Sequence, residues 1–169
     1  MHTRRYVVMG VSGSGKTTIG PRLARALGVE YVEGDDLHPP GNVEKMRAGI
    51  PLTDADREPW LRRIAARLRE AKAQDEGLVV ASSALKKKYR DLLRSAGDPD
   101  VQFVYLKGSK SVIAERVAMR HDHFMPAGLL ESQFTALEEP GPDEHAWVAD
   151  VSKSLDAVVA NLIARAHEP

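Results

Sequence analysis

Short apolar runs alternate along the chain with longer segments in which apolar residues recur every three or four positions. Such continuous apolar runs are typical of strands that are covered on both faces. Their alternation with helical patterns indicates a parallel sheet with crossover helices, so we predict an α/β fold in three layers. The predicted strands of one five-stranded parallel sheet are Tyr6–Met9, Val29–Val32, Leu78–Ala81, Val101–Leu106 and Trp147–Val151.

Helices are predicted between these strands by apolar positions at i, i+3, i+4 and i+7. Another helix is predicted at Thr18–Leu27, although Pro21 should distort its backbone. The chain has no internal repeat and no Gly/Ser linker, and its length of 169 residues suits one domain over residues 1–169. The apolar residues with this helical spacing are Leu61, Ile64, Ala65 and Leu68 in one predicted helix, and Leu155, Val158, Val159 and Leu162 in another.

The charge balance limits the kinds of partner. The 24 Lys and Arg residues are matched by 24 Asp and Glu residues, which argues against a broad positive field for nucleic acid or an anionic membrane. Any bound anion therefore needs a local site.

The sequence has no Cys, which excludes disulfides and thiolate chemistry. Its first apolar run is too short for a signal peptide or a membrane span. We expect a cytoplasmic protein.

One local anion site is evident directly after the first predicted strand, where the sequence matches the phosphate-binding pattern G-x-x-x-x-G-K-[ST]. Glycines let successive backbone N–H groups point at phosphate oxygens, and the following helix N-terminus adds partial positive charge. Lys16 is expected to reach the β- and γ-phosphates of a bound nucleotide, and Thr17 to ligate Mg²⁺. The predicted nucleotide-binding residues are Gly10, Val11, Ser12, Gly13, Ser14, Gly15, Lys16, Thr17 and Thr18.

A small-molecule phosphotransferase suits this chain better than other nucleotide-binding classes. The guanine-reading segment Asn-Lys-x-Asp of regulatory GTPases does not occur, and helicases or transporter ATPases need longer chains. The predicted loop Gly34–Gly41, after the second predicted strand, contains Asp35 at the sheet edge where open α/β folds bind ligands. We predict that Asp35 accepts or orients the proton of the acceptor hydroxyl. The alternative is that Asp35 and His38 only form a turn or cap a helix.

Several runs beyond the phosphate-binding loop make the chain resemble the gluconate kinases, a family of P-loop small-molecule kinases. The resemblance implies phosphate transfer from ATP to the 6-hydroxyl of D-gluconate, in sugar-acid catabolism that feeds the pentose phosphate pathway. It further implies a mobile lid near residues 120–130 and a homodimer. The runs are Gly34–Pro39, Asn42–Met46, Pro51–Leu61, Ser83–Arg94, His123–Pro126, Ser132–Phe134 and Leu137–Pro140.

Gluconate is a carboxylate on a row of hydroxyl groups, so its pocket should combine cations with hydrogen-bonding groups. We expect Arg57 and Arg90 to bind the carboxylate and nearby hydroxyls, with Lys86 and His38 completing the pocket. Arg57 has an alternative as half of a helix-start ion pair with Asp56. The neighbouring basic residues Lys87, Lys88 and Arg94 are interpreted as a solvated helix face.

Three further residues are assigned through the resemblance. Arg116 and Arg120 lie four apart, on one face of a helix that leads to the lid, and either could stabilise charge on the transferring phosphoryl group. Gln133 is expected to contact substrate or to act as a buried structural amide.

The sequence thus predicts a single-domain P-loop kinase that phosphorylates gluconate with MgATP, using Lys16, Asp35 and Arg120 as catalytic residues. The alternatives are a shikimate-type or nucleoside-monophosphate kinase and a nucleotide-binding module without phosphotransfer.

Overall fold

The computed structural model of the chain describes residues 4–119 and 127–168. It contains one five-stranded parallel sheet with the strand order β2-β3-β1-β4-β5, which confirms the predicted fold class. Each predicted strand is present with ends within one residue of its expected position. The strands are β1 (Arg5–Met9), β2 (Glu30–Glu33), β3 (Leu78–Ala81), β4 (Gln102–Lys107) and β5 (Trp147–Asp150).

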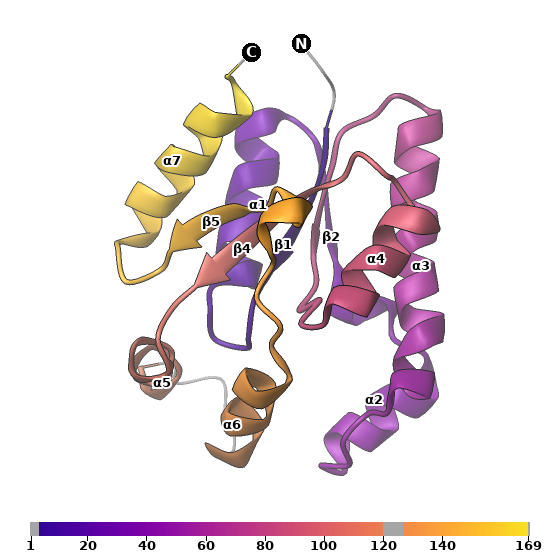
Figure 1. Cartoon of the computed structure of the whole chain (residues 1–169), viewed down its shortest axis with the longest axis vertical. Helices are drawn as coiled ribbons and strands as arrows, with labels where there is room; N and C mark the ends of the chain where they lie inside the picture. The colour runs from indigo at the N-terminus through magenta and orange to yellow at the C-terminus, as the bar shows by residue number, and fades with distance from the viewer. Residues whose placement is uncertain (1–3, 120–126, 169) are drawn as a thin grey trace.

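Helices cover both faces of the sheet, as Figure 1 shows, with α1 and α7 on one side and α3 and α4 on the other. Neighbouring residues of a strand point to opposite faces, so Val8 joins the core under α1 and α7, and Val7 the core under α3 and α4. The helices are α1 (Lys16–Leu27), α2 (Pro40–Arg47), α3 (Asp54–Ala73), α4 (Lys87–Ser95), α5 (Lys110–Ala118), α6 (Ala127–Ala136) and α7 (Leu155–Ala166), with 3₁₀ turns η1 (Gly34–Leu37) and η2 (Pro142–Glu144).

Two local features differ from expectation. Pro21 lies inside α1 without ending the helix, although it cannot donate the usual bond to the carbonyl of Thr17. The segment predicted as a loop at Gly34–Gly41 instead contains η1 and the start of α2. Pro40 occupies the first turn of α2, where its fixed backbone angle favours a helix and its missing N–H costs nothing.

The loops that follow the first three strands meet at one end of the molecule. In Figure 1 the start of β1 and the end of α7 lie at one end of the molecule, and α2, α5 and α6 lie at the other. In the parallel sheet all strands end at the same edge, so the loops after β1, β2 and β3 come together there. No helix in the described part of the chain is both long and apolar enough to span a bilayer.

Candidate active site

The phosphate-binding loop connects β1 to α1 with a backbone that requires glycine. Gly10, Gly13 and Gly15 have φ angles of 151°, 83° and 105°, which side-chain-bearing residues rarely adopt. A Cβ atom on Gly13 would also lie 2.5 Å from Cγ2 of Val117 in α5. The loop therefore has the tight turn that the motif predicts, and α5 packs directly against it.

The loop presents several donors to an anion. Within residues 4–119 and 127–168, the backbone amides of Gly13, Gly15 and Thr17 have no hydrogen-bond acceptor. The Lys16 ammonium donates to the carbonyls of Gly10 at 2.9 Å and Val11 at 3.0 Å, so the positive charge lies over the loop. These amides and this charge are what a polyphosphate requires.

The donor set also fits magnesium. Thr17 is exposed in the first turn of α1, and its hydroxyl is the hard oxygen ligand that Mg²⁺ prefers. The described residues contain no group of three or more His, Cys, Asp or Glu side chains arranged to hold a metal. In kinases Mg²⁺ commonly takes most of its ligands from phosphate and water, so one hydroxyl from the protein fits such a site.

Gln133 in α6 contacts the phosphate-binding loop. Its Oε1 accepts from the backbone N–H of Ser12 at 2.6 Å, and its Nε2 donates to Oγ of Ser12 at 2.8 Å. Both ends of the amide are therefore used by one loop residue. This geometry matches the structural alternative for Gln133 and connects α6 to the loop.

Arg116 joins three segments near the loop. Its Nη2 donates to the carbonyls of Val151 and, at 3.1 Å, Lys153, which follow β5, and its Nη1 lies close to Gly15. The guanidinium thus lies between α5, the phosphate-binding loop and the segment before α7. Arg120 and the first part of the predicted lid lie outside the described residues.

The turn η1 places Asp35 at the same sheet edge. A Cβ on Gly34 would lie 2.2 Å from the carbonyl oxygen of Ala81, so only glycine lets η1 approach the end of β3 this closely. The indole N–H of Trp60 donates to the Gly34 carbonyl at 2.7 Å and fixes the turn from the other side. Asp35 is exposed beside this anchored glycine.

His38 is buried next to the turn, and its ring stacks on Trp60 with centroids 4.3 Å apart. The amide nitrogen of Asn42 donates to the Asp56 carbonyl at 2.8 Å and lies 3.2 Å from Nδ1 of His38. Because a carbonyl only accepts, the amide orientation is fixed and Nδ1 must accept. Burial, together with the charge of Arg57, lowers the pKa of His38, which favours a neutral ring with its proton on Nε2.

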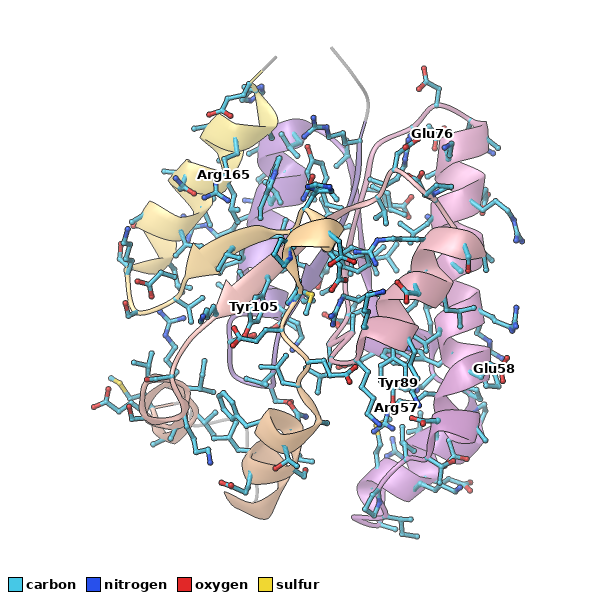
Figure 2. The ribbon with its side chains drawn as sticks, viewed as in Figure 1. Arg57, Glu58, Glu76, Tyr89, Tyr105 and Arg165 are labelled. Atoms are coloured by element: carbon cyan, nitrogen blue, oxygen red, sulfur yellow. The ribbon has the colours of Figure 1, made fainter. Side chains whose placement is uncertain are left out.

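A group of basic side chains surrounds one tyrosine between α3 and α4. Charged atoms of Arg57, Lys86 and Lys88 lie 5.7 Å, 5.8 Å and 5.9 Å from the centroid of the Tyr89 ring. Figure 2 shows Arg57 and Tyr89 next to each other between the two helices. We call Arg57, Lys86 and Lys88 the cation cluster.

Asp54, at the start of α3, is the counter-ion of the cation cluster. Its carboxylate accepts hydrogen bonds from Lys88 and from the Tyr89 hydroxyl, and lies 3.6 Å from Nζ of Lys86 and 3.9 Å from Nη1 of Arg57. Hydrogen bonds from Lys88 and Tyr89 hold the pKa of Asp54 well below its usual range. Lys88 is exposed, as expected for a solvated helix face, and it also belongs to this cluster.

The structure does not pair Arg57 with Asp56, the partner that the helix-start alternative gave it. Asp56 forms the capping box of α3 with Thr53 and pairs with Lys45 at 2.9 Å. Arg57 contacts Asp54 and Tyr89 instead. Its half-buried guanidinium therefore belongs to the cation cluster.

Arg90 does not join the cation cluster, contrary to the expected contact with a substrate carboxylate. Its side chain is fully buried, and its five N–H groups donate to the carbonyls of Ala84, Leu85 and Glu138 and to both carboxylate oxygens of Glu144. No donor is left for a ligand. This geometry gives Arg90 a structural role, because it supports the segment that leads into Lys86.

A cavity of about 650 Å³ opens between the start of α4 and α6. Its volume lies within the range of about 300–1,000 Å³ that is common for small-molecule sites. One cation-cluster residue, Lys86, lines it directly. The other lining residues are Gly128, Glu131, Ser132, Thr135, Ala136 and Glu138.

Sequence reasoning missed several residues that shape the site. Trp60 lies in the core under α3, and it also holds both Gly34 and His38. Asp54 and Tyr89 carried no signal by themselves, because the packing of α3 against α4 brings them together. The only indication in the sequence that Asp54 and Tyr89 belong to the site was that they lie within the charged runs at 51–61 and 83–94.

The chain is similar to several known proteins. A family model described as AAA domain matches residues 6–140. The gluconokinase of Gluconobacter oxydans (strain 621H) is 49% identical over 95% of this chain and 89% of its own, and the thermoresistant gluconokinase of Escherichia coli (strain K12) is 44% identical over 94% and 90%. The crystal structure of a gluconokinase from Sinorhizobium meliloti 1021 superposes with a TM-score of 0.88 at 47% identity, covering 96% of this chain and 91% of that one.

Proposed function

We propose that this chain, which belongs to the gluconokinase family, transfers the γ-phosphoryl group of ATP to the 6-hydroxyl group of D-gluconate. The observation that carries the proposal is the position of two complementary anion sites in one fold. A glycine-rich loop suited to a polyphosphate follows β1, and a cation cluster suited to a carboxylate lies between α3 and α4. A kinase for a sugar acid needs both.

The residues of the phosphate-binding loop would hold the nucleotide. The amides of Gly13, Gly15 and Thr17 are directed to the phosphates, and Lys16 stabilises the negative charge that develops during transfer. Thr17 would hold Mg²⁺, which neutralises phosphate charge when bound. Arg116 adds positive charge next to Gly15, and the predicted role of Arg120 in the lid remains part of the proposal.

The acceptor would lie along the edge of the sheet between Asp35 and the cation cluster. Arg57 and Lys86 bind the gluconate carboxylate, since both are half-exposed and neither is within hydrogen-bond distance of Asp54. Asp35 orients the 6-hydroxyl group and takes its proton. The neutral His38 ring donates from Nε2 to a substrate hydroxyl.

A coupled assay of ADP release with gluconate, shikimate and AMP as separate acceptors tests this function. We expect only gluconate to accelerate ADP release. Preference for shikimate or AMP would replace gluconokinase activity by one of the related kinase activities. ATP binding without any acceptor-dependent ADP release would instead indicate a nucleotide-binding module.

Asp35→Asn tests the acceptor side of the mechanism. The amide cannot take a proton, so turnover with gluconate should fall by about 10²–10⁴-fold, the usual range for a lost general base. ATP binding, measured by calorimetry, should stay within about twofold because the loop after β1 is unchanged. Asp36→Asn, an exposed neighbour in the same turn, is the matched control. Equal activity of the Asp35 and Asp36 variants would contradict the role of Asp35.

The family resemblance also implies a homodimer. Sedimentation of the purified chain tests this state, and a single species at the mass of one chain, 18.5 kDa, would contradict it.

A further inference from the structure

We propose that Asp54 and Tyr89 are positioning residues that hold Arg57 and Lys86 in place for the carboxylate of the acceptor. The inference rests on the proposed gluconokinase function and deepens it. Neither residue is needed to contact the substrate. They act through the two cations that do.

The Tyr89 hydroxyl connects Asp54 to Arg57. It donates to the Asp54 carboxylate and accepts from Nη1 of Arg57 at 3.3 Å. Burial and the bond to Asp54 raise the pKa of Tyr89 to about 12, so the hydroxyl keeps its proton at neutral pH. Tyr89 itself is buried, with 6% of its surface exposed, which fixes the hydroxyl in space. An otherwise flexible arginine side chain is thereby held at one end.

Asp54 also offsets repulsion within the cation cluster. Arg57, Lys86 and Lys88 carry three like charges around one ring, and such side chains separate in water unless an anion lies among them. Lys88 forms a hydrogen-bonded ion pair with Asp54, whereas Lys86 and Arg57 form longer ion pairs with it, at 3.6 Å and 3.9 Å. Three cations share one carboxylate, so the cluster keeps a net positive charge for a substrate anion.

The same contacts set the spacing of the two helices. Asp54 and Arg57 belong to α3, whereas Lys88 and Tyr89 belong to α4, and Lys86 precedes α4 as its N-cap. The bonds from Asp54 to Lys88 and Tyr89 join residues 34 and 35 positions apart. They fix how far Arg57 lies from Lys86. A planar carboxylate that bonds to both cations requires this distance to be constant.

Steady-state kinetics of Tyr89→Phe and Asp54→Asn test the inference. Tyr89→Phe should raise KM for gluconate about fivefold, the effect of one lost hydrogen bond, and Asp54→Asn about tenfold. kcat and KM for ATP should each change less than about twofold, because the phosphate-binding loop is untouched. Asp54→Glu, which keeps the charge, should restore part of the affinity for gluconate.

Asp91→Asn is the matched control for Asp54. It removes an exposed carboxylate of α4 that pairs with Lys87 at 3.0 Å and has no bond to the cation cluster. KM values of this variant should equal those of the unaltered enzyme. Melting temperatures of all variants separate misfolding from mispositioning, and Tyr89→Phe keeps the buried ring if Asp54→Asn proves unstable.

Three results would overturn the inference. KM for gluconate that stays constant in both variants would show that the contacts are dispensable. A lower KM would show that Asp54 competes with the substrate, and a parallel loss of kcat and of both affinities would show a general structural role. Absence of gluconate turnover in the unaltered enzyme would instead remove the proposed function, and this inference with it.

Discussion

Lys16→Ala is expected to reduce gluconate-dependent turnover by at least about 10²–10³-fold, the effect of removing one preorganised donor of transition-state charge. The Lys16 ammonium lies over the loop carbonyls of Gly10 and Val11, where the phosphates of a bound nucleotide would pass. The positive charge of Lys16 stabilises the transition state, in which negative charge shifts between the phosphates, more than it stabilises the bound ground state. kcat should therefore fall more than the affinity for ATP. A coupled ADP assay, with calorimetry for ATP binding, measures both.

Lys87→Ala provides the control for this substitution. Lys87 is an exposed lysine that pairs with Asp91 on α4, away from the phosphate-binding loop. Its removal should leave kcat and both KM values within about twofold. Activity of a folded Lys16→Ala variant equal to that of the Lys87 variant would refute the assignment of the loop.

The fold could be predicted from sequence because its strands are short continuous apolar runs. Val79 and Val80, for example, are buried on opposite faces of β3, and no other element explains such a run as simply. Helix α2 escaped prediction because Pro39 and Pro40 suggest a loop unless the second proline falls in a first helical turn. The residues of this turn were compatible with either a loop or the start of a helix, whereas the apolar runs clearly indicated buried strands.

The site was predictable only in part, for a different reason. Motif residues such as Lys16 and Asp35 are fixed by their position after a strand, whereas the cation cluster depends on the packing of α3 against α4. Arg90 was misassigned because its charge suggested a ligand. Its spacing of three from the buried Leu93 places it on the inner face of α4, and that spacing was visible in the sequence.

The burial of Arg90 leads to the largest stability effect that we expect. Glu144 holds it with bonds of 2.7 Å to Nε and 3.0 Å to Nη2, and it also accepts from Arg94 and from the backbone of Gly141. Glu144→Gln removes the charge and leaves the Arg90 guanidinium buried without its counter-ion. The free energy of unfolding in urea at pH 7 should fall by about 3–5 kcal/mol.

A second substitution distinguishes a lost ion pair from lost packing. Arg90→Met combined with Glu144→Leu removes both charges and fills similar volume, and should recover part of the stability lost in Glu144→Gln. A double variant that is less stable than Glu144→Gln would show that the bonds of Arg90 to the carbonyls of Ala84 and Leu85 matter more than the ion pair.

Acid unfolding gives an independent measure of the same pair. Burial of Glu144 opposes its ionisation, but hydrogen bonds from Arg90 and Arg94 outweigh it and lower the pKa of Glu144 to about 2 from its ordinary 4.5. A carboxylate with a lowered pKa in the folded chain stabilises it fully above about pH 4.5, and this contribution is lost as the pH falls toward 2. Stability of the unaltered chain should therefore decline through this window. Glu144→Gln should show a shallower decline, because the amide does not titrate, and an equal slope in both chains would mean that other carboxylates control the acid transition.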